Sequence, residues 1–220
     1  MPPKDNSRAL AVMARVPELG KVKTRLEPFL GAEKTKELYL CFLSDIFANL
    51  KKLNSVDVFV FYTPENLTDE FVELIPYGIP LAPQKGSDLG ERMLNAASHL
   101  FGATYESVVI IGSDSPDLPV SYIEEAFKSV EGGKDIAIGP ASDGGYYLVA
   151  LSDPKKAPFA GVNWGTETVL EETLAVMDSE GTKYSLLSEW YDIDEKNDLA
   201  FLKNNLEAPK SSDFVSKLIL

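Results

Sequence analysis

The sequence feature that most constrains the fold is a series of short, apolar, β-prone runs separated by stretches of helical periodicity. Residues 107–112 form the strongest of these runs, and residues 8–14 form another near the start of the chain. Continuous apolar runs of this length are typical of strands that are buried on both faces of a parallel sheet. Because strands that alternate with helices imply a mainly parallel sheet with a helical layer on each side, we expect an α/β fold in three layers.

Hydrophobic periodicity and turn residues place the other elements along the chain. Further strands are expected at residues 56–62, 79–82, 135–139, 146–151 and 184–187. Helices are expected at residues 31–50, 66–74, 88–101, 120–130, 167–177 and, as the last of them, 195–203. No repeat, low-complexity tract or Gly/Ser linker divides the chain, so we expect a single domain over residues 1–220. Its core is expected at about residues 8–203, with a C-terminal tail, residues 204–220, that packs on the surface or on a partner.

The composition excludes several classes of protein. A formal net charge of −13 argues against nucleic acid as a partner, since phosphate backbones are bound mainly by Lys and Arg. Cys41 is the single cysteine, which excludes an internal disulfide and a cysteine-rich metal site. No apolar run approaches the roughly 20 residues of a membrane-spanning helix, and residues 1–8 lack the apolar stretch of a secretory signal. We therefore expect a cytoplasmic protein without a membrane span.

The same negative charge would repel the phosphates of a nucleotide. A nucleotide enzyme of this composition therefore needs local positive charge, either from a few well-placed basic residues or from a bound metal ion.

The first candidate motif is the loop that follows the strand expected at residues 8–14. It contains four cations, Arg15, Lys21, Lys23 and Arg25, but neither the glycine pattern of a dinucleotide site nor that of a P-loop. Lys supplies a mobile point charge, while Arg can hold two phosphate oxygens at once. From spacing alone, a phosphate site and a solvated basic loop are about equally good interpretations.

The second motif, residues 112–119, follows the strongest strand. Asp114 lies where a buried strand opens into a turn, and a carboxylate there can coordinate a hard cation, which prefers oxygen ligands. An alternative is that Asp117 or Ser121 only caps the following helix. Capping by one of these two leaves Asp114 unexplained, so we favour metal binding for Asp114.

The third motif is the Asp-x-Asp of Asp192 and Asp194. On a strand, two residues at this spacing share one face, and two like charges so close are unfavourable unless a cation lies between them. Alternatively, Asp194 is the N-cap of the helix at residues 195–203. Both roles can coexist if Asp192 binds the metal directly or through water. Since the three motifs follow strands, and ligands bind at the carboxyl ends of parallel strands, we expect them to converge.

Two other segments carry weaker signals. In the segment 83–92, Gln84 has both an amide donor and an acceptor, as base reading requires, although a surface position is the simpler interpretation. In the segment 140–147, the paired glycines Gly144 and Gly145 would let a ligand approach the backbone, or would form an ordinary hairpin turn.

Other chemistries have little support in the sequence. His99, the one histidine, lies on an amphipathic helix and is expected to be packed or exposed rather than catalytic. The nucleophile motif of serine hydrolases and the zinc motif H-E-x-x-H are both absent. A hydrolase with Asp114 as the phosphoryl acceptor is conceivable, but Asp114 lacks a D-x-D partner at its own strand end.

Taken together, the motifs resemble those of a known family. The resemblance rests on five ordered segments, residues 14–26, 86–93, 112–119, 139–148 and 192–194, and extends over roughly residues 8–203. The chain is similar to uncharacterised glycosyltransferase-A-like transferases of the nucleotide-diphospho-sugar transferase superfamily. More distantly, residues 23–26 resemble a Lys-Ser-Arg-Leu segment of deazaflavin-cofactor guanylyltransferases. The glycine-rich first loop of the sugar nucleotidyltransferases is missing, because Gly20 is the only glycine there.

This resemblance implies a single glycosyltransferase-A-like (Rossmann-like) α/β domain and a role for each motif. It implies that Lys23 and Arg25 face donor phosphates and that Mg²⁺ or Mn²⁺ is held by Asp114, Asp192 and Asp194. The full set of nucleotide-binding residues that we predict is Arg15, Lys21, Lys23, Arg25, Gln84, Gly90 and Ser113, with Lys23, Arg25 and Asp114 as the catalytic ones. The predicted substrate-binding residues are Asp143, Gly144, Gly145 and Trp164.

The expected function is a metal-dependent transferase that acts on a nucleotide or nucleotide-diphospho-sugar donor and a small-molecule acceptor. One alternative is a nucleotidyltransferase that releases pyrophosphate, similar to the guanylyltransferases that act on phosphorylated acids. A non-catalytic nucleotide-binding or scaffold domain is an alternative of another class, and it predicts nucleotide binding that is indifferent to Mg²⁺.

Overall fold

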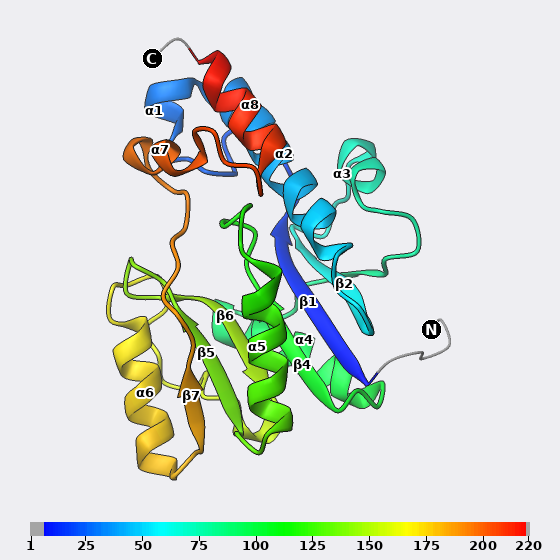
Figure 1. Cartoon of the computed structure of the whole chain (residues 1–220), viewed down its shortest axis with the longest axis vertical. Helices are drawn as coiled ribbons and strands as arrows, with labels where there is room; N and C mark the ends of the chain where they lie inside the picture. Colours follow the sequence, from blue (N-terminus) through cyan, green and yellow to red (C-terminus); the bar gives the residue numbers. More distant parts are fainter. Residues whose placement is uncertain (1–6, 219–220) are drawn as a thin grey trace.

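The protein's structure, a computed structural model, describes residues 7–218 and is built on one seven-stranded sheet (Figure 1). The expectations made for residues 1–6 and for the last two residues of the tail lie outside the described residues. The sheet has the order β3-β2-β1-β4-β6-β5-β7. Its strands are β1 (Arg8–Arg15), β2 (Val56–Thr63), β3 (Leu81–Pro83), β4 (Ser107–Ile111), β5 (Ile136–Pro140), β6 (Tyr146–Leu151) and β7 (Tyr184–Leu186).

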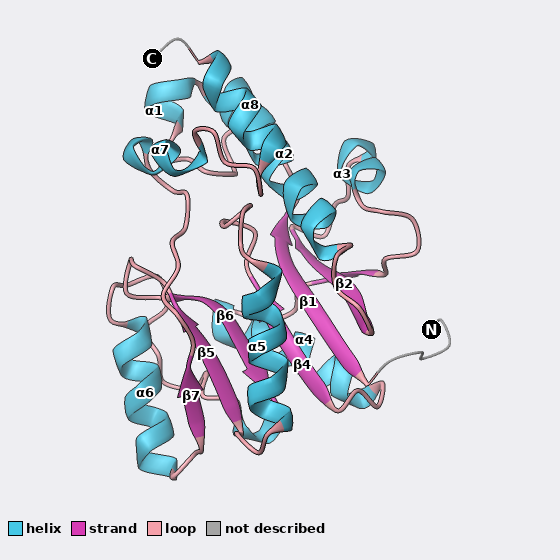
Figure 2. Cartoon of the chain, in the orientation of Figure 1, coloured by secondary structure: helices cyan, strands magenta, loops and turns pink. Residues whose placement is uncertain are grey.

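Helices connect most of these strands and cover the sheet (Figure 2). They are α1 (Glu27–Leu30), α2 (Ala32–Leu50), α3 (Asp69–Leu74), α4 (Leu89–Gly102), α5 (Val120–Glu131), α6 (Val169–Glu180), α7 (Leu199–Leu202) and α8 (Pro209–Lys217), with short 3-10 helices at η1 (Pro154–Lys156) and η2 (Lys196–Asp198). Among the described residues, no helix combines the length and the apolarity that crossing a bilayer requires.

The strand directions confirm a mainly parallel sheet with one exception. Strand β6 runs antiparallel to both of its neighbours, β4 and β5, whereas the other neighbouring pairs are parallel. The exception follows from the turn between β5 and β6, where Gly144 has a φ of +90° and the Gly145 N–H donates to Asp143 Oδ1 at 2.9 Å. A tight turn of this kind joins antiparallel neighbours, since parallel ones need a long crossover.

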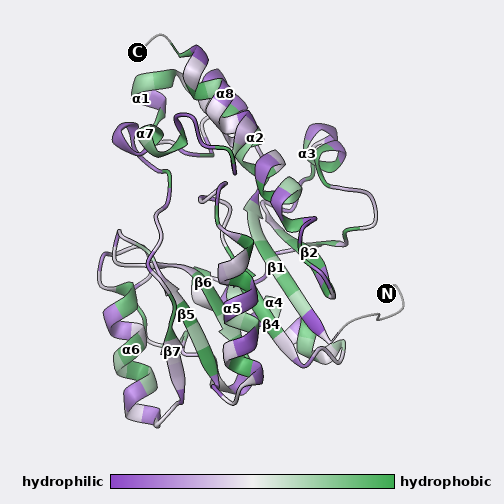
Figure 3. Cartoon of the chain, viewed as in Figure 1, coloured by the Kyte–Doolittle hydropathy of each residue, from purple (hydrophilic) through white to green (hydrophobic). Residues whose placement is uncertain are grey.

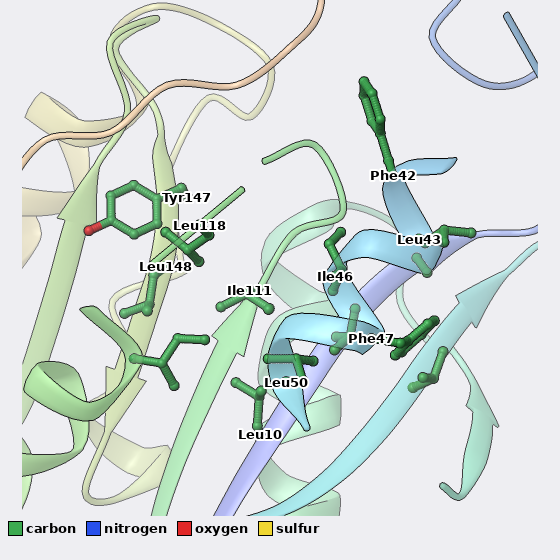
Figure 4. Close-up of a cluster of buried hydrophobic side chains, with 14 of the residues drawn as sticks. Leu10, Phe42, Leu43, Ile46, Phe47, Leu50, Ile111, Leu118, Tyr147 and Leu148 are labelled. Atoms are coloured by element: carbon green, nitrogen blue, oxygen red, sulfur yellow. The ribbon is translucent and has the colours of Figure 1, made fainter. Parts of the chain in front are cut away.

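Two apolar layers pack on opposite faces of the sheet, as alternation along β1 shows. Leu10, Val12 and Ala14 pack with α2 and α5 on one face, while Ala11 and Met13 pack with α4 and α6 on the other. The strands are accordingly apolar over most of their length (Figure 3). Figure 4 shows the first layer in detail, with the side chains of α2 lying over β1 and β4.

The strands and most helices lie within a few residues of their expected positions, and the C-terminal part differs most. The helix expected at residues 195–203 is divided into η2 and α7, and it is not the last helix, because the tail forms α8. Helix α8 packs along α2 (Figure 1). The sequence pattern of α8 is short and rich in Ser and Lys, so it gave no sign of the buried partner that this helix finds on α2.

That partner is Asp45, a buried carboxylate on α2. Its side chain accepts hydrogen bonds from the Lys210 N–H at 3.1 Å, the Ser211 N–H at 2.8 Å and the Ser211 hydroxyl at 2.6 Å. These donors belong to the first turn of α8, whose N–H groups have no partner within the helix. Asp45 therefore caps α8 from another helix.

We expect Asp45→Ala to lower the free energy of unfolding by about 2–4 kcal/mol, because it leaves several buried donors without an acceptor. Asp213→Ala is the matched control on α8, where the carboxylate forms only an exposed ion pair with Lys217. A loss of at most about 0.5 kcal/mol is expected there. Urea unfolding of both variants checks the difference, and equal losses would contradict the capping role.

Candidate active site

A large cavity opens at the edge of the sheet where the parallel strands have their carboxyl ends. Its volume is about 850 Å³, within the range of roughly 300–1,000 Å³ that is usual for small-molecule sites. It lies over the carboxyl ends of β1 and β4, from which the chain continues to strands nearer opposite edges of the sheet, β2 and β5 respectively. This reversal of strand order is where open α/β sheets bind their ligands.

The cavity gathers most of the residues that the sequence singled out. Its basic lining residues are Arg15, Lys21, Lys23 and Arg25 of the loop after β1, together with Arg92 of α4. Its acidic lining residues are Asp114, Asp143, Glu167, Asp192 and Asp194. Equal numbers of basic and acidic residues make its lining neutral in a chain of net charge −13, so the cavity provides the local relief that an anionic ligand requires.

Lys23 lies at the centre of the acidic cluster. Its ammonium forms ion pairs with Asp114 Oδ1 and, at 2.8 Å, with Asp194 Oδ1. Only 3% of the Lys23 side chain is exposed, against 46% for Asp114 and 37% for Asp194. Burial alone would lower the pKa of Lys23, but the two carboxylates more than offset it and raise the pKa well above its usual value. Lys23 is therefore a permanent cation.

The backbone of Lys23 is in the left-handed region, with a φ of +47°. A residue with a Cβ adopts this conformation at a cost of about 1–2 kcal/mol, so the surrounding contacts must hold it there. The conformation turns the lysine away from the open loop and towards Asp114 and Asp194. The predicted basic loop is thus divided: Lys23 points inward, while Arg15, Lys21 and Arg25 form no ion pair with the part of the chain that the structure describes.

Asp192 completes the acidic cluster and differs from its two partners. Its Oδ1 accepts a hydrogen bond from the Ser115 hydroxyl at 2.6 Å. Burial, together with the nearby charge of Asp114, raises the pKa of Asp192 to about 7, although Ser115 and Lys23 act in the opposite direction. The clustering of like charges that the Asp-x-Asp motif predicted is therefore present, and Lys23 balances only part of it.

These carboxylates have the chemistry that Mg²⁺ or Mn²⁺ prefers, namely several oxygens from more than one loop. The position already attracts a cation, because the ammonium of Lys23 is held there. Within residues 7–218, no three His, Cys, Asp or Glu side chains stand ready as a metal-binding group. Asp114, Asp192 and Asp194 thus carry oxygens of the kind that a divalent cation prefers, but they do not form a ready-made metal-binding group, and the ammonium of Lys23 lies between two of them.

The alternative of capping is wrong for Asp194 and for Asp117. The short helix after Asp194 is capped instead by Glu195 and by Asp198, whose Oδ2 accepts from the N–H groups of Asp194 and Glu195. The Asp-x-Asp motif also does not lie on a strand, but its backbone is extended enough that Ile193 is buried while its two neighbours face the cavity.

Asp117 instead connects the loop after β4 to the C-terminal part of the chain. Its Oδ2 accepts hydrogen bonds from the Tyr191 hydroxyl and, at 2.6 Å, from Asn205 Nδ2. Helix α5 begins after Pro119 with no side-chain cap. The Ile193 N–H also donates to the Asp114 carbonyl at 2.9 Å, so both loops that carry the carboxylates are joined directly.

Ser113 and Gln84 are placed differently from their predicted use as nucleotide ligands. The Ser113 hydroxyl is paired with the Tyr39 hydroxyl at 2.8 Å, and Tyr39 also accepts from the Arg15 N–H at 3.0 Å. Gln84 Nε2 donates to the carbonyls of Ala14 at 3.2 Å and Phe61 at 2.9 Å. Both residues line the cavity, but their donors hold strand ends together, which leaves Gln84 only its amide oxygen for a ligand.

Gly90 has a packing role that the sequence did not indicate. A Cβ at this position would lie 2.6–2.7 Å from the indole of Trp164, so the absence of a side chain lets Trp164 press against the first turn of α4. Trp164 also makes edge-on ring contacts with Tyr146 and Phe159. Trp164 therefore forms a firm wall of the cavity between α4 and β6.

We expect Gly90→Ala to lower the free energy of unfolding by about 1–3 kcal/mol, because the added methyl group meets the Trp164 ring. Gly102→Ala, at the other end of α4, is the matched control, since a Cβ there meets nothing within 4 Å. It is expected to be neutral or slightly stabilising, as Ala is the better helix former. Urea unfolding followed by tryptophan fluorescence compares them, and a neutral Gly90→Ala would refute the contact.

The segment between β5 and β6 forms the hairpin turn, which is one of the two roles expected for it. It also brings Asp143 and Gly145 to the wall of the cavity. Gly144 does not line the cavity; a Cβ there would lie 2.0 Å from the Glu167 carbonyl oxygen, so this glycine allows the loop before α6 to pack closely. His99 is exposed and contacts Phe61 edge-on, outside the cavity lining, as expected.

The residues of the site that the sequence did not indicate include Tyr39, Arg92 and Ser115. Tyr39 has the periodicity of a core residue of α2, and burial with the charge of Asp114 raises its pKa to about 12. Arg92 lies two residues after Gly90 in a segment that was considered only for base binding, and its Nε donates to the Gly86 carbonyl at 3.2 Å. Ser115 lies next to Asp114, but nothing in its spacing indicates that it contacts Asp192.

Comparison with known proteins finds a family model that matches the chain. The model of the family described as "Uncharacterized protein conserved in bacteria (DUF2064)" matches residues 46–166, which is more than half of the chain. The matched segment contains Asp114, Asp143 and Trp164. The loop that carries Lys23 and the segment that carries Asp192 and Asp194 lie outside it.

Two curated relatives have the same name, 2-phospho-L-lactate guanylyltransferase. The protein from Methanocaldococcus infernus is 34% identical over 134 residues, which are 61% of this chain and 57% of the relative. The protein from Methanocaldococcus jannaschii is 28% identical over 143 residues, which are 64% of this chain and 59% of the relative. The matches therefore extend over less than two thirds of the length of these relatives.

Solved structures share the fold over nearly the whole chain. A "putative nucleotide-diphospho-sugar transferase" from Desulfovibrio desulfuricans G20 has a TM-score of 0.84 and 30% identity, and the match covers 96% of this chain and 98% of that one. A cytidylyltransferase from Leptospira borgpetersenii has a TM-score of 0.62 and covers 96% and 93%, but at 15% identity this likeness shows the fold alone. The expected glycosyltransferase-A-like fold is confirmed.

Proposed function

The chain belongs to the bacterial DUF2064 family, and from this premise we propose that it is a metal-dependent nucleotidyltransferase. The observation that carries the proposal is the contact of Lys23 with Asp114 and Asp194 at the carboxyl ends of the strands, beside three basic side chains without ion pairs. The sequence likeness to two guanylyltransferases favours nucleotidyl transfer over glycosyl transfer. Nucleotidyl transfer, an alternative in the sequence analysis, is therefore the function that we propose first.

The proposed reaction is an in-line displacement at the α-phosphorus of a nucleoside triphosphate. An oxygen of the acceptor forms a bond to the α-phosphorus, the bond from that phosphorus to the bridging oxygen breaks, and pyrophosphate leaves with the electron pair. A phosphate oxygen of the acceptor is already deprotonated at neutral pH and needs no general base. The relatives are named for a phosphorylated acid, and we extend that acceptor class, a phosphate-bearing small acid, to this chain.

The basic residues of the first loop would neutralise the triphosphate. Arg25 and Arg15 can each hold two phosphate oxygens, and Lys21 adds a mobile charge. Lys23 would face the charge that develops on the leaving pyrophosphate. Asp114, Asp192 and Asp194 would hold the divalent cation. When bound, Mg²⁺ or Mn²⁺ would supply a Lewis acid that draws charge from the phosphate oxygens.

The far side of the cavity suits the acceptor. Trp164 and Tyr146 form an aromatic wall, and Arg92 adds a positive charge from the first turn of α4. Asp143 orders the turn that carries Gly145, whose backbone lies at the cavity wall. Of the substrate-binding residues predicted from the sequence, Asp143, Gly145 and Trp164 remain candidates for contact, whereas Gly144 would act through packing.

The experiment that tests the proposal incubates the protein with each of the four nucleoside triphosphates, a panel of phosphorylated small acids, and Mg²⁺ or Mn²⁺. Pyrophosphate release that requires both an acceptor and the metal is expected, and chelation with EDTA should abolish it. Release of a free nucleoside diphosphate from a nucleotide-sugar would instead indicate glycosyl transfer. Nucleotide binding that is unchanged by EDTA, without turnover, would support the non-catalytic alternative.

A second candidate, transfer from a nucleotide-diphospho-sugar, has one observation in its favour. The structural relative that is 30% identical over nearly the whole chain is named for that activity. Both chemistries would use the same carboxylates and cations, because both neutralise a leaving phosphate group. They differ in the bond that breaks, so the phosphorus-containing product distinguishes them.

A further inference from the structure

Lys23 occupies the position in the acidic cluster that a divalent cation would need. Its ammonium takes one oxygen from Asp114 and one from Asp194, which belong to loops 80 residues apart along the chain. Mg²⁺ binds carboxylate oxygens at about 2.1 Å and repels a nearby ammonium strongly. The lysine and a divalent cation therefore cannot share these two oxygens.

The contacts of Lys23 hold its ammonium firmly within the acidic cluster. The side chain is almost completely buried, and its ammonium lies 5.6 Å from the centre of the Phe42 ring, on which a cation is stabilised. No other basic side chain of the described residues is paired with Asp114 or Asp194. The absence of a ready-made group of three metal ligands in residues 7–218 agrees with this arrangement.

Two features of the site favour a second position of Lys23, outside the acidic cluster. Its backbone is held in the unfavourable left-handed region, so a change of the loop that moves Lys23 outward also relieves strain. Lys21 and Arg25, its neighbours in the loop, line the open cavity without ion pairs. A buried ammonium that leaves two carboxylates needs a new anion, and a phosphate group in this cavity would supply one.

We propose that Lys23 closes the acidic cluster in the empty protein and is drawn out by a phosphate-bearing ligand, so that the divalent cation and this ligand bind together. This inference rests on the proposed function. It predicts that the metal alone binds weakly, and that loss of Lys23 has opposite effects on the metal alone and on the metal–nucleotide complex.

The test measures Mn²⁺ binding by electron paramagnetic resonance, without nucleotide, in the native protein and in Lys23→Met. The variant removes the ammonium but keeps an unbranched side chain that fills the space. We expect its dissociation constant for Mn²⁺ to be at least tenfold lower than that of the native protein. Lys52→Met is the matched control, since Lys52 is exposed and pairs with Glu207 outside the cavity lining, and a change of at most about threefold is expected.

A second measurement, isothermal titration with preformed Mn²⁺–GTP or another Mn²⁺–nucleoside triphosphate, uses the same proteins. Here we expect Lys23→Met to bind at least tenfold more weakly than the native protein, because the phosphate loses its ammonium. Weaker binding by Lys23→Met of both Mn²⁺ alone and the Mn²⁺–nucleotide complex would overturn the proposed exchange of Lys23 for the metal ion. Unchanged binding of Mn²⁺ alone would overturn it as well. Failure of all four Mn²⁺–nucleotide complexes to bind the native protein would contradict the proposed function itself and the exchange with it.

A poorly folded Lys23→Met protein would be recognised by a lowered melting temperature, and Lys23→Arg then decides the question. Arg keeps the positive charge in the cluster, so Mn²⁺ alone should still bind as weakly as it binds the native protein. Mn²⁺ binding by Lys23→Arg that is tenfold tighter than native binding would contradict a blocking role for the charge.

Discussion

Replacing Asp114 by Asn is expected to reduce the rate of the proposed nucleotidyl transfer by roughly 10²–10³-fold or more. The carboxylate lies at the carboxyl end of β4, is partly exposed to the cavity and pairs with Lys23, so it is the acidic side chain best placed to act on a bound phosphate. Asn has nearly the same shape but lacks the charge, so the variant should fold. Because the lost interaction would stabilise the transition state, kcat should fall more than KM rises.

The measurement is a steady-state assay of pyrophosphate release once an acceptor has been identified. Asp213→Asn is the matched control, because Asp213 is an exposed residue of α8 that pairs with Lys217, outside the cavity lining. The control should retain full activity. An Asp114→Asn protein that keeps more than a tenth of the native kcat would show that Asp114 does not hold a group essential to the reaction.

Replacing Asp192 by Asn is expected to stabilise the metal-free protein at pH 8 by about 2–4 kcal/mol while abolishing most of its activity. The pKa of Asp192 is raised to about 7 by burial and by Asp114, above the ordinary value near 3.8. Above pH 7 the carboxylate is charged in both the folded and the unfolded state, and its ionisation disfavours the fold. As the pH rises from about 4 to 7, the unfolded chain loses this proton first, so the contribution of Asp192 to stability falls across that window.

Urea unfolding in EDTA between pH 4 and pH 8 tests the direction of this change in stability with pH. The difference between Asp192→Asn and the native protein should be small near pH 4 and should grow through pH 7. Asp194→Asn is the matched control two residues away, and it should destabilise the fold, because it removes a partner of the buried Lys23. A difference between Asp192→Asn and the native protein that does not vary with pH would rule out the raised pKa.

The sequence was sufficient to predict the layers and the location of the site, for a physical reason that particular residues illustrate. Apolar runs such as residues 107–111 are stable only as strands that are buried inside a sheet. The polar residues that follow such parallel strands then lie together at one edge of that sheet. This is why Asp114, Asp192 and Lys23 could be expected to lie together although they are far apart along the chain.

The contacts within the site could not be predicted in the same way, because they depend on the direction of side chains. Spacing cannot show that Lys23 adopts a left-handed backbone and turns inward while Arg25 faces the cavity. Nor can it show that Asp117 receives Tyr191 and Asn205 instead of capping a helix. The sequence shows which side chains can form such contacts, but it does not show which distant residues they contact.

Helix α8 shows the same limit for secondary structure. Its residues are mostly polar, and its first turn is stabilised by Asp45, 165 residues earlier in the chain. A residue on another element therefore decides where this helix begins. Local patterns cannot reveal such a contribution.

The measurement that most directly tests the central claim is a crystal structure with Mn²⁺ and a nucleoside triphosphate that cannot be hydrolysed, with anomalous scattering recorded at the manganese edge. The account predicts a manganese peak within bonding distance of Asp114 and of at least one of Asp192 and Asp194. It also predicts that the ammonium of Lys23 has moved to a phosphate oxygen. A nucleotide bound elsewhere, or a manganese peak away from these carboxylates with Lys23 still between Asp114 and Asp194, would contradict it.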